Sequence, residues 1–324
     1  MFARNRYRFP WERLRQLGVM GMNERNADFI LPYNPRRNYP KVDNKLLTKK
    51  LAMEAGIAVP ELYGVIEIVH QIEQLSELLK LYQDFVIKPA HGAGGEGILI
   101  VTGRQNGRYR KANGALADDE ELGHHISNIL GGLYSLGGLP DSALIEYRVR
   151  FDPIFENISF QGVPDVRTLV FRGVPVLAMM RLPTRLSDGK ANLHQGAIGV
   201  GIDVASGRTF SGVWREHIVD HHPDTGGNLA GRLIPYWDEI LGLTAKCHDL
   251  AGLGFIGVDI VLDEDCGPMM LEINARPGLS IQLANRIGLL PRLRHVEAMS
   301  AIPEPVAERV QMAKTLARYP LSGS

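Results

Sequence analysis

Cysteine is nearly absent from this 324-residue sequence, which contains only Cys247 and Cys266. Two cysteines cannot build the disulfide framework of a small secreted protein, and they do not form the paired spacing of a structural zinc site. An excess of one charge is also lacking, because Lys+Arg and Asp+Glu both number 36. Nucleic-acid-binding domains usually carry a basic excess, so we expect no nucleic-acid partner.

The sequence also lacks a hydrophobic run that could span a bilayer. The longest uncharged stretch, residues 126–140, is rich in Gly and Ser and is shorter than the ~20 residues that a membrane-spanning helix needs. The N-terminus carries Arg4, Arg6 and Arg8 but no apolar segment of the kind found in export signals. We therefore predict a cytoplasmic protein without a membrane span. The 45% of apolar residues suffice for two or three packed subdomains.

Hydrophobic periodicity predicts helices and strands that alternate along the chain, as in layered folds that contain both. Residues 1–41 read as a basic arm, in which Pro32, Pro35 and Pro40 interrupt an extended segment. The arm is either a strap over the body or a docking segment for a partner. Helices are predicted from Asp43 to Gly56, near 72–82, within 103–140 and at 241–253, and strands at 62–66, 85–87, 98–101, 143–147, 168–171 and 174–180.

A β-hairpin is predicted over residues 255–274, where two apolar runs flank a short polar turn. Its register decides which polar side chains meet. If the turn pairs Leu262 with Met269, Asp259 lies directly opposite Glu272.

Asn274 follows Glu272 by two residues, so both side chains point to the same side of the strand. The two carboxylates of Asp259 and Glu272, held this close together, would repel one another, so a cation should lie between them. The donors are all hard oxygens, without Cys or His, which selects Mg²⁺, with Mn²⁺ as a substitute. The alternative is that these residues form the polar face of an exposed hairpin.

A lysine precedes a glycine-rich loop. Lys88 ends a predicted strand, and the loop that follows contains Gly92, Gly94, Gly95 and Gly97. Glycines let backbone N–H groups approach phosphate oxygens, and the lysine adds a positive charge. The order of lysine before glycines excludes a Walker A loop, and the strand that follows excludes a dinucleotide fingerprint. A mobile turn explains the glycines equally well.

Four further positions, Lys45, Asp165, Arg167 and Lys190, carry charge near these segments. Lys45, at the start of the first predicted helix, matters only if a polyphosphate needs a second cation. Asp165 and Arg167 share a face of one strand, which suits a ribose and a phosphate but also an ordinary ion pair. Lys190 lies close to His194, which we interpret as structural rather than as a ligand.

Taken in order, these segments resemble the ATP-grasp superfamily and, within it, the RimK-type alpha-L-glutamate ligases. The resemblance covers about residues 42–282. It rests on Gly257-Val-Asp259-Ile, on Leu271-Glu272-Ile-Asn274 with Pro277-Gly278, on Asn192-Leu-His194, and on Glu146-Tyr147 followed by Asp165-Val-Arg167. The basic segment from Asn34 to Arg37 is similar to the alpha-L-glutamate ligase-like branch, in which an arm replaces the full N-terminal domain.

The resemblance implies an α/β (α+β) architecture, the ATP-grasp fold, in which two subdomains clasp ATP. The ATP-grasp domain would cover 42–300, with a lid subdomain at about 84–147, a metal-site subdomain at about 165–290 and a tail at 301–324. Position by position, it implies that Lys45 and Lys88 contact the phosphates of ATP and that the loop with Gly92, Gly94, Gly95 and Gly97 closes over them. Glu146 and Tyr147 would hold adenine, and Asp165 and Lys190 would contact the nucleotide. Asp259, Glu272 and Asn274 would bind Mg²⁺.

The implied function is an ATP- and Mg²⁺-dependent ligase that joins a carboxylate to an amine through an acyl phosphate. Arg276 or Arg181 would stabilise the transferring group, and Arg167 is a third candidate catalytic cation. The partners would be a small-molecule or peptide carboxylate and an amine, with glutamate as one candidate and a homo-oligomer as one arrangement. Two alternatives remain open: a kinase or a glycan- or peptide-pathway enzyme on the same fold, and a regulatory module that binds ATP without catalysis.

Overall fold

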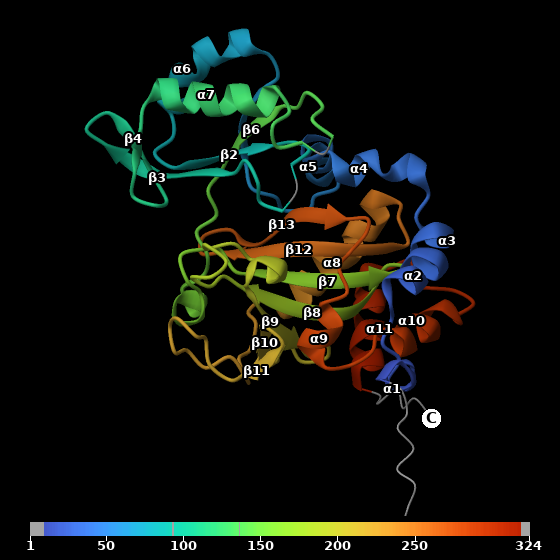
Figure 1. Cartoon of the computed structure of the whole chain (residues 1–324). Helices are drawn as coiled ribbons and strands as arrows, with labels where there is room; N and C mark the ends of the chain where they lie inside the picture. Colours follow the sequence, from blue (N-terminus) through green and yellow to red (C-terminus); the bar gives the residue numbers. More distant parts are fainter. Residues whose placement is uncertain (1–9, 93, 136, 319–324) are drawn as a thin grey trace, which may run out of the picture.

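The computed structural model describes residues 10–92, 94–135 and 137–318, whose strands form two antiparallel sheets with separate hydrophobic cores (Figure 1). The smaller sheet lies in the upper half of Figure 1 and the larger one in the lower half. The predicted α/β (α+β) architecture of two layered units with mixed helices is therefore confirmed.

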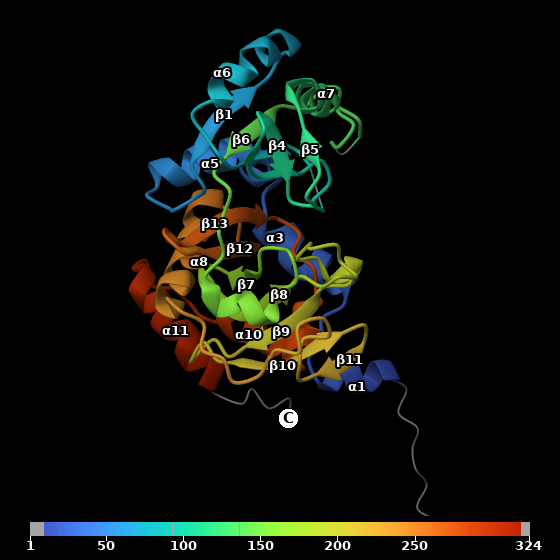
Figure 2. The same cartoon turned by 90° about the vertical axis from the view of Figure 1, so that its left-hand side faces the viewer.

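The upper sheet has six strands. Their spatial order is β1 (Leu62–Ile66), β6 (Ala143–Glu146), β2 (Phe85–Pro89), β3 (Leu99–Gln105), β4 (Arg108–Lys111) and β5 (Leu116–Ala117). Helices α6 (Leu75–Leu79) and α7 (Asp119–Leu130) pack on it, and their apolar residues share one core with β2 (Figure 2). Because β1 pairs with β6, this unit begins near residue 62, earlier than the 84 expected for the lid.

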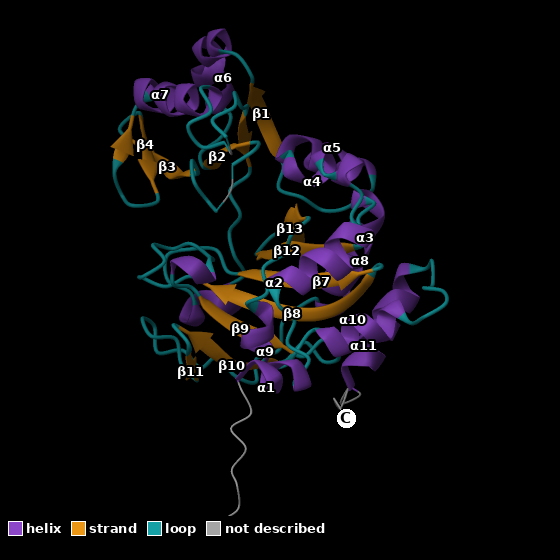
Figure 3. Ribbon diagram, turned by 45° about the vertical axis from the view of Figure 1, so that its right-hand side comes forward, coloured by secondary structure: helices purple, strands orange, loops and turns teal. Residues whose placement is uncertain are grey.

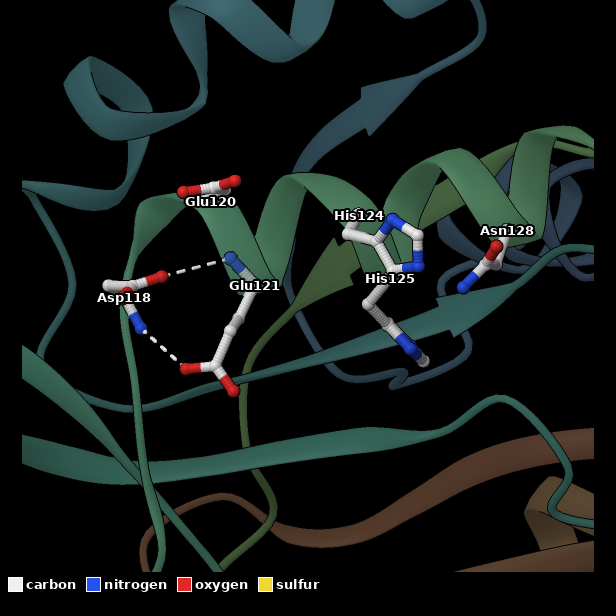
Figure 4. A pocket seen from close by; sticks show the side chains of 6 residues that line it. All are labelled: Asp118, Glu120, Glu121, His124, His125 and Asn128. Atoms are coloured by element: carbon white, nitrogen blue, oxygen red, sulfur yellow. Dashed lines mark hydrogen bonds between the residues drawn. The ribbon is translucent and has the colours of Figure 1, made fainter.

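A capping box starts α7. The Asp118 carboxylate accepts a hydrogen bond from the Glu121 amide at 3.0 Å, and the Glu121 carboxylate accepts one from the Asp118 amide at 3.2 Å (Figure 4). Both satisfy amide groups that a helix terminus otherwise leaves unpaired. His124, His125 and Asn128 follow on the same helix.

The lower sheet has seven strands. Their order is β11 (His217–Val219), β10 (Thr209–Trp214), β9 (Ile198–Ile202), β8 (Val174–Leu182), β7 (Asp165–Phe171), β12 (Phe255–Asp263) and β13 (Gly267–Asn274). Helices α8 (Trp237–Ala251), α9 (Ile281–Asn285), α10 (Leu290–Glu297) and α11 (Val306–Arg318) contact it. Short 3₁₀ turns lie at Val69–Gln74, Pro153–Ile158 and Leu193–Gln195.

The described part of the arm is helical, so the expected extended segment is wrong. It contains α1 (Pro10–Gln16), α2 (Met22–Glu24), a π-helical turn (Arg25–Ile30), α3 (Leu31–Tyr33), a 3₁₀ turn (Arg36–Asn38) and the start of α4 (Pro40–Asp43). The predicted helix α5 (Lys45–Glu54) follows the arm. Pro32 and Pro40 lie in the first turn of their helices, where the missing amide hydrogen costs nothing. Met20, Phe29 and Ile30 are buried in the lower core. Helices α4 and α5 contact β13, at the level between the two sheets (Figure 3).

Several other sequence expectations need correction. Strands β4, β5, β9, β10 and β11 were not predicted, because β9 alternates with glycine and β4 is mostly charged. The predicted helix near 72–82 is a 3₁₀ turn followed by the five-residue α6. Residues 306–318, expected within a tail, form α11, whose Val310, Ala313 and Leu316 are buried in the lower core.

Candidate functional site

Charged side chains of alternating sign line one face of the lower sheet, across β8, β7, β12 and β13. Arg181 donates to Asp165 at 2.6 and 2.5 Å and to Asp259 at 2.7 Å. Arg167 donates to Asp259 at 2.6 and 2.5 Å and lies 3.7 Å from Glu272. The register explains this ladder, because Asp165 is paired with Arg181 across β7 and β8, and Arg167 with Asp259 across β7 and β12.

The ladder is buried, and its charges shift each other's pKa values. Asp259 is 1% exposed. Burial alone would raise the pKa of Asp259, but Arg167 and Arg181 hold it well below its usual range. Burial raises the pKa of Asp165 to about 6 against the opposing effect of Arg181, and the negative charge of Asp259 adds to the rise. Asp165 is bound by Arg181, its partner across the strands, so the ion pair of Asp165 with Arg167 that the sequence also allowed is not formed.

Asp259 does lie opposite Glu272, but not by the register that we expected. Leu262 pairs with Pro268 rather than with Met269, and an irregularity between Asp259 and Ile260 restores the alignment. A β-bulge adds one residue to one strand and changes the facing of the residues beyond it. The predicted juxtaposition is confirmed, and the pairing from which it was argued is wrong.

The cations expected between the carboxylates are partly supplied by the protein, since two guanidinium groups already bind Asp259. Glu272 is different: it is the most exposed carboxylate of the ladder, and Asn274 donates to it at 3.1 Å. That contact leaves the Asn274 amide oxygen directed elsewhere. No group of three or more His, Cys, Asp or Glu side chains in the described ranges is arranged to hold a metal, whereas the candidate set has two carboxylates and an amide.

Two buried lysines share one carboxylate in the upper unit. The ammonium groups of Lys88 and Lys49 both pair with Glu146, the latter at 2.6 Å, and Lys49 also donates to the Pro60 carbonyl. Burial would raise the pKa of Glu146, but Lys88 and Lys49 outweigh it and lower the pKa. Glu146 thus holds Lys88 in place rather than projecting toward solvent.

Lys45 lies beside this pair at the start of α5. It donates to the Gly92 carbonyl of the glycine loop, and burial lowers its pKa. Because Glu272 is among the charges that raise its pKa, Lys45 stands between the upper lysines and the lower ladder. Lys45 and Lys49 are four residues apart on one helix face, a spacing that could have drawn attention to Lys49, which the sequence analysis missed.

The glycine loop is anchored at both ends. Gly97 accepts a hydrogen bond from His125 at 3.0 Å, and at the other end Gly92 forms a β-bridge with Ser135. Next to Gly97, Glu96 lies 3.4 Å from Lys190, which belongs to the lower unit. The loop of the upper unit therefore contacts the lower unit through this ion pair.

We expect Gly97→Ala to loosen this loop much more than Gly94→Ala. Both glycines have a left-handed backbone, with φ of +73° and +66°, so each alanine costs about 1–2 kcal/mol. At Gly97 the added Cβ would also lie 2.6 Å from the Tyr134 ring, whereas at Gly94 it meets nothing within 4 Å. Native-state hydrogen exchange of the loop amides measures the difference, and equal protection in the two variants would contradict it.

Lys190 and His194 lie on a loop that His222 supports. The His222 ring is 1% exposed and lies 2.9 Å from the Pro183 carbonyl through Nε2. Its Nδ1 accepts from the amides of Asp224 and Thr225, so the neutral ring carries its proton on Nε2. Burial lowers the pKa of His222.

Acidification should therefore destabilise the fold through His222. Below the unfolded pKa of about 6.5, the unfolded chain takes up a proton that the folded ring resists, so the free energy of unfolding falls as pH decreases. Urea unfolding at graded pH measures this slope. His222→Gln should flatten it, whereas His217→Gln, at an exposed position of β11, should not. An unchanged slope in His222→Gln would contradict the assignment.

Two expected site residues make other contacts. Tyr147 donates its hydroxyl hydrogen to Asp263 at 3.0 Å, and its amide to the Glu61 carbonyl at 2.8 Å, so that amide is already used. Arg276 is exposed and lies over the Tyr39 ring at 4.7 Å, whereas Arg167 and Arg181 bind carboxylates within the ladder.

A family model described as sugar-transfer associated ATP-grasp matches residues 24–298. A search of curated proteins finds no match. Similar solved structures include the ATP-grasp ligase PsnB with a minimal precursor, at 15% identity and a TM-score of 0.44, covering 87% of this chain and 63% of PsnB. D-cycloserine synthetase DcsG has 13% identity, a TM-score of 0.43 and coverage of 87% and 73%. D-alanine–D-alanine ligase from Bacillus anthracis has 14% identity, a TM-score of 0.42 and coverage of 86% and 66%.

The chain thus spans less than two thirds of the PsnB chain. Within the described residues, the structure has no helix with the length and apolar character needed to cross a bilayer. The family match covers most of the sequence, including the arm from residue 24, the glycine loop and the charged ladder. The chain therefore belongs to the sugar-transfer associated ATP-grasp family.

Proposed function

We propose that this protein is an ATP- and Mg²⁺-dependent carboxylate–amine ligase. The observation that carries the proposal is the placement of two opposed charged groups. Lys45, Lys88 and the glycine loop supply positive charge and backbone amides from above, and Glu272 with Asn274 supplies hard oxygens from below. A nucleotide triphosphate with its magnesium ion is a ligand that needs both.

The donor set fits a magnesium ion. Three carboxylates, Asp165, Asp259 and Glu272, meet two guanidinium groups in the ladder, and Glu272 has only the longer contact with Arg167, at 3.7 Å, and the nearby charge of Lys45. Glu272, Asn274 and Asp259 would hold the ion, with Mn²⁺ as a substitute, and the ion would offset charge on the phosphate oxygens. Asp259 is already bound by Arg167 and Arg181, so Glu272 is the principal ligand of the metal ion in this proposal.

The reaction needs positioning and neutralisation more than covalent chemistry from the protein. An oxygen of the carboxylate substrate attacks the γ-phosphorus; a new O–P bond forms, the bond to the leaving oxygen breaks, and ADP departs. The amine nitrogen then attacks the acyl carbon, releases phosphate and gives up a proton to solvent. Lys88 and Lys45 would orient the phosphates, Lys190 and Asp165 would flank the nucleotide, and the loop of Gly92 to Gly97 would exclude water that hydrolyses the acyl phosphate.

The arginines have distinct places in this proposal. Arg181 and Arg167 are bound to Asp165 and Asp259, so they would stabilise the transferring group through their charge from the sheet face. Arg276 would act from its position over Tyr39. Glu146 and Tyr147 would lie on the adenine side, and Glu146 also holds Lys88, which would contact the phosphates.

The substrates are a narrower question. The RimK-type resemblance implies glutamate, but Arg167 and Arg181 are bound to carboxylates of the protein and are not free to receive its side chain. The family description favours instead an acceptor from a sugar-transfer pathway. We propose a small molecule or peptide carboxylate and an amine, with glutamate as one candidate.

A coupled ADP-release screen over carboxylates and amines, with Mg²⁺ and mass spectrometry of the products, tests the proposal. Amine-dependent ADP release with an amide product supports ligation, and glutamate addition would add the mass of a glutamyl residue. A phosphorylated product without an amine would show a kinase. ATP binding without turnover on any pair would show a regulatory module, and either result would overturn the ligase assignment.

A further inference from the structure

The arm is fixed to the end of the metal-site hairpin. The buried Asn34 side chain donates to the carbonyls of Phe255 and Ala275 at 2.7 and 2.9 Å and accepts from the Phe255 amide at 2.8 Å. Gln282 exchanges two hydrogen bonds with the backbone of Met20, at 2.8 and 3.0 Å. These contacts place the π-helical turn that starts at Arg25 next to the residues that follow β13.

Arg25 is held there by neutral groups. Its Nη1 donates to the Pro277 carbonyl at 2.9 Å, and its Nε and Nη2 donate to the Asn26 side-chain oxygen at 3.0 and 2.8 Å. Arg276, next to Pro277 in the chain, rests on the face of Tyr39. Among the residues that the structure describes, neither guanidinium has an ion pair with a carboxylate.

The acidic residues of this arm are bound to another cation. Glu24 and Asp28 both face Arg294, which also pairs with Glu297 at 2.8 Å. In the sequence, Arg25 therefore lies between two acidic residues, Glu24 and Asp28, and it forms an ion pair with neither. Burial lowers the pKa of Arg25, and the positive charge of Arg276 adds to this effect, as expected for two neighbouring cations.

This pair of arginines adjoins the proposed metal site. Arg276 follows Glu272 by four residues, so about 13 Å of strand at most separates their backbones. Guanidinium groups bind carboxylate and phosphate with two parallel hydrogen bonds, and two adjacent guanidinium groups, here the half-buried Arg25 and the exposed Arg276, can bind one such group from two sides. We propose that Arg25 and Arg276 form an anion site that receives the carboxylate or phosphate group of the substrate used with ATP.

The role in substrate binding rests on the proposed ligase function, whereas the anion site itself does not. Residue-resolved labelling tests the site directly. The protein, with Mg²⁺ and a non-hydrolysable ATP analogue added to fill the nucleotide site, is treated with phenylglyoxal, which modifies accessible arginines. Inorganic phosphate and succinate serve as probes, and labelled peptides are quantified by mass spectrometry. We expect either probe, or both, to slow labelling of Arg25 and Arg276 while Arg13, on α1, is unaffected.

Variants show whether the two arginines act together. Arg25→Gln should raise the probe concentration that half-protects Arg276 by about tenfold, the equivalent of roughly 1.4 kcal/mol of binding. Arg25→Lys, which keeps the charge, should have a smaller effect, and Arg13→Gln none. Thermal melting identifies a variant that has failed to fold, and the wild-type protection stands without any variant.

The outcomes separate this inference from the proposed function. Lack of protection by both probes, or protection of Arg276 that is indifferent to Arg25→Gln, overturns the anion site even if amine-dependent ADP release is found. Protection that depends on Arg25 supports the site even if no ligase activity is found, in which case the proposed function alone fails. Protection by phosphate but not succinate assigns a phosphate group, and the reverse assigns a carboxylate.

Discussion

Glu272→Gln is expected to reduce ATP-dependent turnover on the order of 10²–10³-fold, the typical effect of removing one preorganised electrostatic contact from an active site. Glu272 is the carboxylate of the ladder with the weakest protein cation, 3.7 Å from Arg167, so its charge remains free for a metal ion. Replacing it by a neutral amide of the same shape leaves the backbone and the contact with Asn274 largely intact. ADP release measures the loss, and calorimetry with and without Mg²⁺ should show that ATP affinity has lost much of its metal dependence.

Glu264→Gln is the matched control. Glu264 lies in the turn of the same hairpin, exposed to solvent, where it faces Arg150 at 3.3 Å. Its substitution changes the charge of the hairpin by the same amount without touching the ladder. If Glu272→Gln and Glu264→Gln behaved alike, or if ATP affinity in the wild type were indifferent to Mg²⁺, the metal assignment would be refuted.

Asp259→Ala should be among the most destabilising single substitutions in the lower unit. The Asp259 carboxylate accepts three hydrogen bonds from Arg167 and Arg181, and both guanidinium groups are largely buried. Removing one partner of a buried ion pair leaves uncompensated charge, at a cost of about 3–5 kcal/mol. Urea unfolding without nucleotide or Mg²⁺ isolates this structural effect from any role in metal binding.

Glu77→Ala provides the comparison for a surface pair. Glu77 pairs with Lys80 on the upper unit, and both side chains are mostly exposed. Such pairs contribute only about 0–1 kcal/mol, because water already solvates both charges. A loss of stability in Asp259→Ala as small as that in Glu77→Ala would mean that Arg167 and Arg181 do not depend on this carboxylate.

The site could be predicted in part from local sequence. Strand alternation places Glu272 and Asn274 on one side, and this requires only that residues 267–274 form a strand. A lysine followed by glycines identified the loop that contacts the lower unit. The register of the hairpin was harder, because the irregularity next to Ile260 has no local marker, and only the tertiary pairing shows that Asp259 still meets Glu272.

The roles of the arginines could not be predicted. Arg167 binds a carboxylate 92 residues away and Arg181 one that is 78 residues away, on strands whose order in the sheet the sequence does not reveal. The same holds for Arg25, whose carbonyl partner is 252 residues distant. Ion-pair partners depend on which strands become neighbours, so charge pattern alone left the pairing of Asp165 open.

By itself, the sequence determined the hairpin, the glycine loop with its preceding lysine, and the side of the strand on which Glu272 and Asn274 lie. Each of these features depends only on the periodicity or the conformational freedom of a few adjacent residues. The tertiary structure decided that Asp259 is neutralised by arginines, that Glu146 is shared by Lys49 and Lys88, and that the arm brings Arg25 beside Arg276. The physical reason is that a buried charge requires a partner of opposite sign, and folding alone determines which distant segments supply it.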